Sequence, residues 1–162
     1  MNYAALGYAG IRADGLLHIE VARHDPGTSW VVESCRKAYA DTGKPIVLDP
    51  RSPSGGLVDQ LKAAEIPVRE LSGSEFVRAC AALQDDVLNL RLRHLDQPAL
   101  NAAVAAADVR VAGESWAFSA RASTVDITPL LAVTLAAFAA RDTNEPAPAA
   151  FHDLSDYLDD DD

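Results

Sequence analysis

A short apolar strand followed at once by a proline- and glycine-rich loop is the feature that most constrains this fold. Residues 45–49 read PIVLD, a continuous apolar run typical of a strand covered on both faces. The sequence PRSPSGG at 50–56 ends that strand, because proline and glycine interrupt regular structure. A helix capped by Ser54 and running through Leu61, and then a second strand at 66–71, complete a strand–helix–strand unit. Such a unit predicts parallel pairing of its two strands.

The remaining segments supply a hairpin and further helices. Tyr3 to Ile11 and Leu16 to His24 flank an Asp-Gly turn signal, which predicts a β-hairpin. Residues 109–124 favour a loop or an irregular hairpin. The order of elements predicts one α/β domain, residues 1–145, with a mixed sheet sandwiched by helices. Apolar spacing and capping signals predict the other helices at 28–42, 72–87, 98–104 and 127–140, of which the last is apolar almost all round and is expected to be buried.

Two of these helices carry clear end signals. Thr28 or Ser29 is available as a cap for the first, and Gly43 is expected to stop it. Ser72 and Glu75 have the spacing of a capping box at the start of the second. The residues expected to share one buried face of that second helix are Phe76, Cys80, Leu83, Gln84 and Val87.

Cysteine usage and hydropathy predict a soluble protein of the cytoplasm. Hydrophobic residues make up 49% of the chain, which is enough for a core without disulfides or metal staples. Cys35 and Cys80 have no paired spacing, which favours reduced, buried thiols over a disulfide or a zinc site. No apolar run approaches the ~20 residues of a membrane span, and no signal-like segment follows Met1.

Negative charge is concentrated near the C-terminus. The net charge of −10 argues against non-specific phosphate binding by the whole surface. Six aspartates lie in residues 152–162, and without them the formal charge is −4. We expect residues 146–162 to be a disordered acidic tail, either simply solvated or a handle for a protein partner.

Several aspartates stand where a ligand site is expected. Asp49 ends the buried strand, and ligands of open α/β sheets bind beyond the carboxyl ends of strands. An aspartate before proline also initiates turns, so both interpretations stay open. Asp126 begins the last helix, where a carboxylate also complements the positive helix end. Asp85 and Asp86 lie in mid-helix, and solvent exposure explains at least one of them. Carboxylates that converge would bind Mg²⁺ or Mn²⁺, and such ions in pairs promote phosphodiester cleavage.

Other catalytic signatures are absent from the sequence, and the basic residues are ambiguous. The histidines are scattered, SPSGG lacks a P-loop lysine, and no GxGxxG or GxSxG motif occurs. This disfavours zinc hydrolases, the common nucleotide-binding folds and serine hydrolases. Arg91, Arg93 and His94, with Arg110 and Arg121 further along, could follow a phosphate backbone. Cations at a helix C-terminus are equally expected from the helix dipole, so both interpretations stay open.

Four consecutive stretches of the sequence carry a recognisable pattern. They are RADGLLHIEVARHDPGTSWVVE, PIVLDPRSPSGGLVDQLKAAEIPV, SEFVRACAALQDDVLNLRLRHLDQPALNAAV and GESWAFSARASTVDITPLLAVTLAAF. Together they resemble the C-terminal nuclease domain of phage large terminase subunits of the actinobacteriophage type. The resemblance extends from Tyr3 to Phe138, and its most specific parts are VLDPRSPSG, LRHLDQPALNAA and SWAFSARASTVDITPLLA.

The resemblance implies a ribonuclease H-like fold, a mixed sheet flanked by helices, and two-metal-ion cutting of concatemeric DNA with Mg²⁺ or Mn²⁺ during phage head filling. By position it implies Asp49 and Asp126 as catalytic metal ligands, with Asp85 as a weaker third match. Our candidate contacts to double-stranded DNA are Arg91, Arg93 and Arg121. The portal and other terminase components are further expected partners, in the cytoplasm of a bacterial host.

The chain departs from the family pattern at its start. Family members have a further metal-binding aspartate on a strand upstream of the one matched by Tyr3 to Gly10, and an N-terminal ATPase domain before it. We expect this nuclease domain to be N-terminally truncated, with weak or absent cleavage. The alternative hypothesis is a non-catalytic interaction module or a prophage remnant on a nuclease-like scaffold, in which an open sheet edge pairs with another chain.

Overall fold

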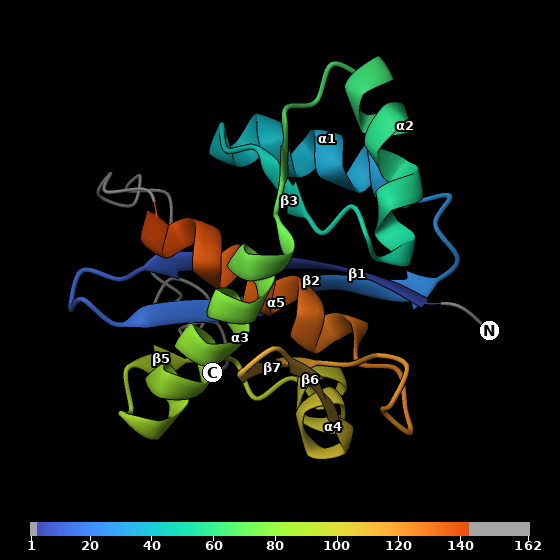
Figure 1. The fold of residues 1–162 in the computed structure, drawn as a ribbon. Helices are drawn as coiled ribbons and strands as arrows, with labels where there is room; N and C mark the ends of the chain where they lie inside the picture. Colours follow the sequence, from blue (N-terminus) through green and yellow to red (C-terminus); the bar gives the residue numbers. More distant parts are fainter. Residues whose placement is uncertain (1–2, 143–162) are drawn as a thin grey trace.

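The computed structural model describes residues 3–142, which form a mixed α/β fold (Figure 1). β1 (Tyr3–Ile11) and β2 (Leu17–Pro26) pair antiparallel and confirm the predicted hairpin. β5 (Leu92–Arg93) adds to β2 in parallel, which gives a mixed sheet in the order β1-β2-β5. The sequence does not predict β5, because two residues are too few to show a periodic pattern.

The strand–helix–strand unit is also confirmed. β3 (Ile46–Leu48) and β4 (Val68–Glu70) pair in parallel. Between them a 3-10 turn, η1 (Pro53–Leu57), leads into α2 (Val58–Ala63). The prediction that Ser54 caps this helix was wrong by two residues. Ser52 caps this segment instead, because its hydroxyl accepts a hydrogen bond from the Ser54 backbone N–H.

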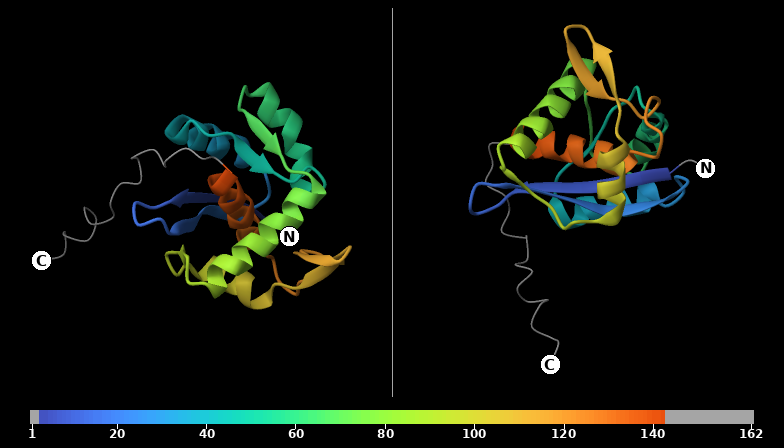
Figure 2. Two further views of the ribbon diagram at one scale, coloured as in Figure 1. Left: turned by 60° about the vertical axis from the view of Figure 1, so that its left-hand side comes forward. Right: turned by 90° about the horizontal axis from the view of Figure 1, so that it is seen from below.

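The described strands form three separate sheets, of which β1-β2-β5 is mixed. Among residues 3–142, β3 and β4 make no ladder with β1, so no described strand pairs with the second edge of β1 or of β3. α5 (Thr128–Asp142) contacts both sheets and lies along β1 (Figure 1 and Figure 2). Gly7 permits this close approach, because a Cβ there would lie 3.0 Å from backbone atoms of Ala132 and Val133. The buried helix, rather than a strand ladder, therefore joins the two sheets.

Two large apolar clusters fill the interior. One joins β2, α3 (Gly73–Leu88), α4 (Pro98–Ala106) and α5. The other joins α1 (Val31–Thr42), α2 and β3, and includes Cys35. Burial raises the pKa of the Cys35 thiol to about 11, so this thiol is inert at neutral pH, as expected for a core cysteine. Among the described residues no helix is long and apolar enough to cross a membrane.

A small hairpin covers part of α3. β6 (Val109–Ala112) and β7 (Ser115–Phe118) pair antiparallel, and β7 packs on α3. The predicted loop or irregular hairpin is therefore a hairpin with a regular ladder, followed by a loop. Cys80 of α3 is buried beside β7, and burial raises the pKa of its thiol. Both cysteines are therefore free, buried thiols, as the sequence predicts.

The helix ends follow the sequence in part. α1 ends at Gly43 (φ 64°) as predicted, but it begins at Val31 without a side-chain cap from Thr28 or Ser29. At the start of α3 the capping box is confirmed, because Ser72 Oγ accepts from the Glu75 N–H and the Glu75 carboxylate accepts from the Ser72 N–H.

The buried face of α3 differs from the prediction near its C-terminal end. Its first part is buried as predicted, at Phe76, Cys80 and Leu83. Gln84 is exposed, and so is Val87, at 54%. Asp86 takes the inner position instead, because two arginines neutralise it there.

Candidate active site

Asp49 lies directly after β3, and Arg51 holds its side chain. Asp49 Oδ1 accepts hydrogen bonds from the Arg51 backbone N–H (3.0 Å) and Arg51 Nε (2.8 Å), and Oδ2 accepts one from Nη2 (2.8 Å). The Asp49 side chain is only 13% exposed. The hydrogen bonds to Asp49 raise the pKa of the Arg51 guanidinium. Asp49 thus combines the strand-end position with a turn-forming role, and both of its carboxylate oxygens are engaged.

Asp126 lies just before α5 and caps its first turn. Its Oδ1 accepts from the Thr128 backbone N–H (3.3 Å), and its Oδ2 accepts from the Thr128 hydroxyl (2.8 Å). The same Oδ2 lies 2.7 Å from Nε2 of His24 in β2, which ties the start of α5 to the hairpin. Sequence reasoning missed His24 as a partner, because the two residues are 102 positions apart and share no motif spacing.

The two neighbouring aspartates of α3 have different environments. The side chain of Asp85 is 61% exposed and pairs with Arg91. The side chain of Asp86 is fully buried and pairs with Arg91 and with Arg141 of α5. Burial lowers the pKa of the Arg141 guanidinium, and the nearby Asp85 charge opposes that effect. Asp86 therefore joins α3 to α5, whereas Asp85 lies at the surface.

The candidate aspartates supply the right kind of donor atom for a hard cation, but too few of them gather in one place. Carboxylate oxygens are the ligands that Mg²⁺ and Mn²⁺ prefer. Within residues 3–142, however, no three His, Cys, Asp or Glu side chains gather as a group that could hold a metal ion. Asp49, Asp85 and Asp126 are not brought together as one ligand set. The described residues therefore do not fit a preformed two-ion site.

The arginines chosen from the sequence lie around the C-terminal end of α3 and in a later loop. Arg91 pairs with Asp85 and Asp86. Arg93 Nη1 donates to the backbone carbonyls of Leu90 (3.1 Å) and Leu92 (2.8 Å). Arg121 lies in the loop between β7 and α5 and is exposed. Their role in DNA binding stays a prediction.

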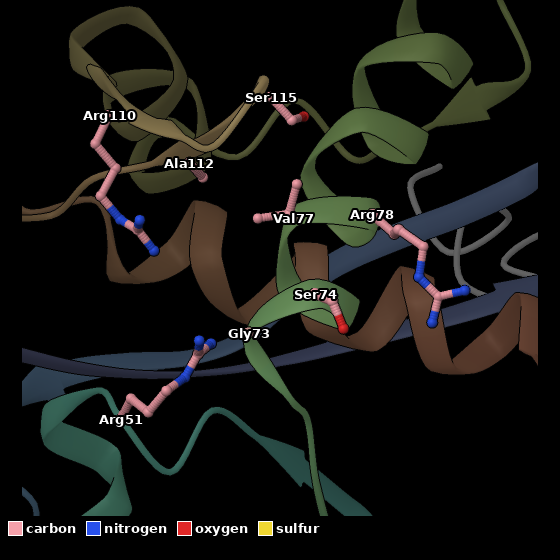
Figure 3. Close-up of a pocket in the computed structure, with 8 residues that line it drawn as sticks. All are labelled: Arg51, Gly73, Ser74, Val77, Arg78, Arg110, Ala112 and Ser115. Carbon is pink, nitrogen blue, oxygen red and sulfur yellow. The ribbon is translucent and has the colours of Figure 1, made fainter.

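A second basic region lies beside Asp49. A hollow of about 550 Å³ separates the start of α3 from the β6–β7 hairpin (Figure 3). We call it the arginine hollow, and it is lined by Arg51, Arg78 and Arg110, by Gly73 and Ser74 of α3, and by Ser115 of the hairpin. Arg51 was missed as a site residue, although its place two residues after Asp49 was a usable turn signal.

The fold matches a known structure. No protein-family model and no curated protein matches the chain. The crystal structure of the HK97 bacteriophage large terminase superposes with a TM-score of 0.64 at 19% identity, covering 85% of this chain and 39% of that one. The chain has a terminase-like fold.

This match confirms the expected fold class, a ribonuclease H-like mixed α/β arrangement flanked by helices. The chain spans well under half the length of the HK97 protein. The acidic segment 146–162 lies outside the described residues, so the proposed boundary at 145 stays a prediction.

Proposed function

We propose that this chain is a terminase-like nuclease domain that acts on double-stranded DNA in phage DNA packaging. The observation that carries the proposal is the terminase-like fold with Asp49 at the carboxyl end of a parallel strand. In this proposal Asp49 and Asp126 are metal ligands for Mg²⁺ or Mn²⁺, with Asp85 as a third. The portal and other terminase components, in an infected bacterial cell, are the proposed partners.

The contacts of Asp49 set the expected level of activity. Arg51 engages both Asp49 oxygens, so a cation at Asp49 has to compete with a bidentate guanidinium. Asp126 is likewise engaged by His24 and Thr128. We therefore expect slow nicking of DNA in Mn²⁺ rather than efficient double-strand cleavage.

The proposal is tested by plasmid nicking. The full chain is incubated with supercoiled plasmid in Mn²⁺, and its nicking rate is compared with that of Asp49→Ala. Asp59→Ala is a matched control, because Asp59 is an exposed carboxylate in the first turn of α2. We expect Asp49→Ala to lose nicking and Asp59→Ala to nick at the rate of the parent. Equal nicking by Asp49→Ala and the parent would sink the assignment of Asp49.

A second candidate function is a non-catalytic interaction module on the same scaffold. It is favoured by the engaged carboxylates and by the lack of a three-ligand group within residues 3–142. Calorimetric titration with Mn²⁺ separates the two candidates. Heat of binding that disappears in Asp49→Ala supports the nuclease, and a parent that takes up no Mn²⁺ supports the protein-interaction module.

A further inference from the structure

We infer that the arginine hollow binds a phosphate group of a nucleic-acid backbone, with Arg51 and Arg110 as its donors. The inference rests on the proposed function only in naming DNA as the source of the phosphate. It differs from the sequence-based choice of Arg91, Arg93 and Arg121, whose positions are at the other end of α3 and after β7.

The geometry of the hollow singles out two guanidinium groups. Figure 3 shows Arg51 and Arg110 pointing toward one another from opposite sides of the hollow, one from the loop after β3 and one from β6. Arg78 lines the hollow, but its guanidinium points away and lies 5.7 Å from the centre of the Phe138 ring. Two planar cations facing one space can hold a phosphate from both sides.

The charge balance of the hollow favours an anion. None of its lining residues is acidic. Within residues 3–142, no ion pair joins Arg110 or Arg78 to a carboxylate, whereas Arg51 shares its charge with Asp49. Arg110 is exposed, so its charge is available to a ligand that approaches from solvent. The repulsion between two positive charges that face one another is reduced when an anion enters between them.

The start of α3 adds a weaker, supporting contribution. Gly73 is the first residue of this 16-residue helix, and a Cβ there would lie 2.1 Å from Arg51 Nη1. The absence of a side chain therefore lets the Arg51 guanidinium lie against the helix end. The first backbone N–H groups of a helix have no partner inside it, and they favour negative charge. Gly73 and Ser74, the first two residues of α3, line the hollow.

Arg51 connects the hollow to the candidate catalytic carboxylate. Its guanidinium touches Asp49 on one side and lines the hollow on the other. A phosphate that attracts Arg51 competes with Asp49 for the same N–H donors. Backbone binding would thereby weaken the Arg51 contact that otherwise engages Asp49.

The test is DNA binding in EDTA, where metal-dependent cleavage plays no part. Anisotropy of a short fluorescent duplex is measured across a salt series for the full chain, Arg110→Gln and Arg51→Gln. We expect each variant to bind more weakly and to lower the slope of log affinity against log salt by about 1, the value for one lost phosphate contact.

Two controls keep the result specific. Arg12→Gln removes the same charge from the β1–β2 turn, where Arg12 pairs with Asp14, and it should keep the parent slope. Arg78→Gln should have a smaller effect than Arg110→Gln, because the Arg78 guanidinium points away. Circular dichroism confirms that each variant is folded.

The outcomes separate the sources of the phosphate and the two proposals. An unchanged slope in both Arg110→Gln and Arg51→Gln would overturn the inference, as would equal losses in Arg12→Gln. The parent could bind inorganic phosphate and lose that binding in Arg110→Gln while its DNA binding is unchanged. That result would show a site for small anions and would also overturn the inference. A reduced slope in a chain that never nicks DNA would support the hollow and reject the nuclease.

Discussion

At the scale of single residues, neighbouring aspartates differ more than their sequence context suggests. Helical periodicity from Phe76 places both position 86 and position 87 near the inner face of α3, and hydrophobicity favours Val87. The structure buries Asp86 instead, because Arg91 and Arg141 reach it from the segment before β5 and from α5. Arg91 is close to Asp86 in sequence, but Arg141 is 55 residues away and leaves no local signal, so sequence reasoning found an acidic pair without finding which member is structural.

Asp86→Asn should therefore destabilise the fold strongly. The change removes the negative charge from a fully buried side chain that pairs with Arg91 and Arg141, and breaking a buried pair costs about 3 kcal/mol. Asp85→Asn is the matched control, since it removes an exposed partner of Arg91 and should cost under about 0.5 kcal/mol. Urea denaturation of both variants measures the difference. Equal midpoints would contradict a structural role for Asp86.

At the scale of elements, local signals predicted most of the fold. The hairpin turn, the stop at Gly43, the capping box and the strand–helix–strand unit each depend on residues close in sequence, and each is confirmed. The errors concern long-range pairing. β5 is too short to be recognised, and the contacts of α5 with β1 and β3 join segments that are far apart in the chain.

Ser72→Ala should weaken the start of α3 by about 1 kcal/mol, the usual cost of losing a serine cap. The backbone N–H of Ser72, and after it the Ser72 hydroxyl that the variant removes, hold the pKa of the Glu75 carboxyl below its ordinary 4.5. A lowered carboxyl pKa stabilises the fold above about pH 4.5, and this contribution is lost as the pH falls through the folded value. Thermal unfolding should show the gap between parent and Ser72→Ala narrowing at acid pH. A gap that widens there would contradict a charged Glu75 in the cap.

At the scale of the whole molecule, the candidate site was predicted in part. Sequence reasoning chose Asp49 and Asp126 because both stand at element ends, and the structure places them there. It could not predict that Arg51 and His24 engage these carboxylates or that Arg110 faces Arg51, because the tertiary fold creates these contacts. Their assignment as metal ligands stays a prediction.

The charge of the whole chain should oppose DNA binding. Removing residues 147–162 deletes six aspartates and changes the formal net charge from −10 to −4. We expect the shortened chain to bind duplex DNA more tightly at low salt, because less negative charge repels the phosphates. The advantage should vanish at high salt, where such repulsion is screened. Equal or weaker low-salt affinity in anisotropy measurements would contradict a repulsive effect of these aspartates.

The separation of the two sheets has a consequence for the backbone amides of β1. An antiparallel strand sends alternate N–H groups to opposite sides, and of the strands that the structure describes β2 alone pairs with β1, on one side. Deuterium uptake along β1 should therefore alternate from residue to residue, fast for the N–H groups facing the open edge and slow for their neighbours. A strand from any source that filled the space beside β1 would abolish this alternation.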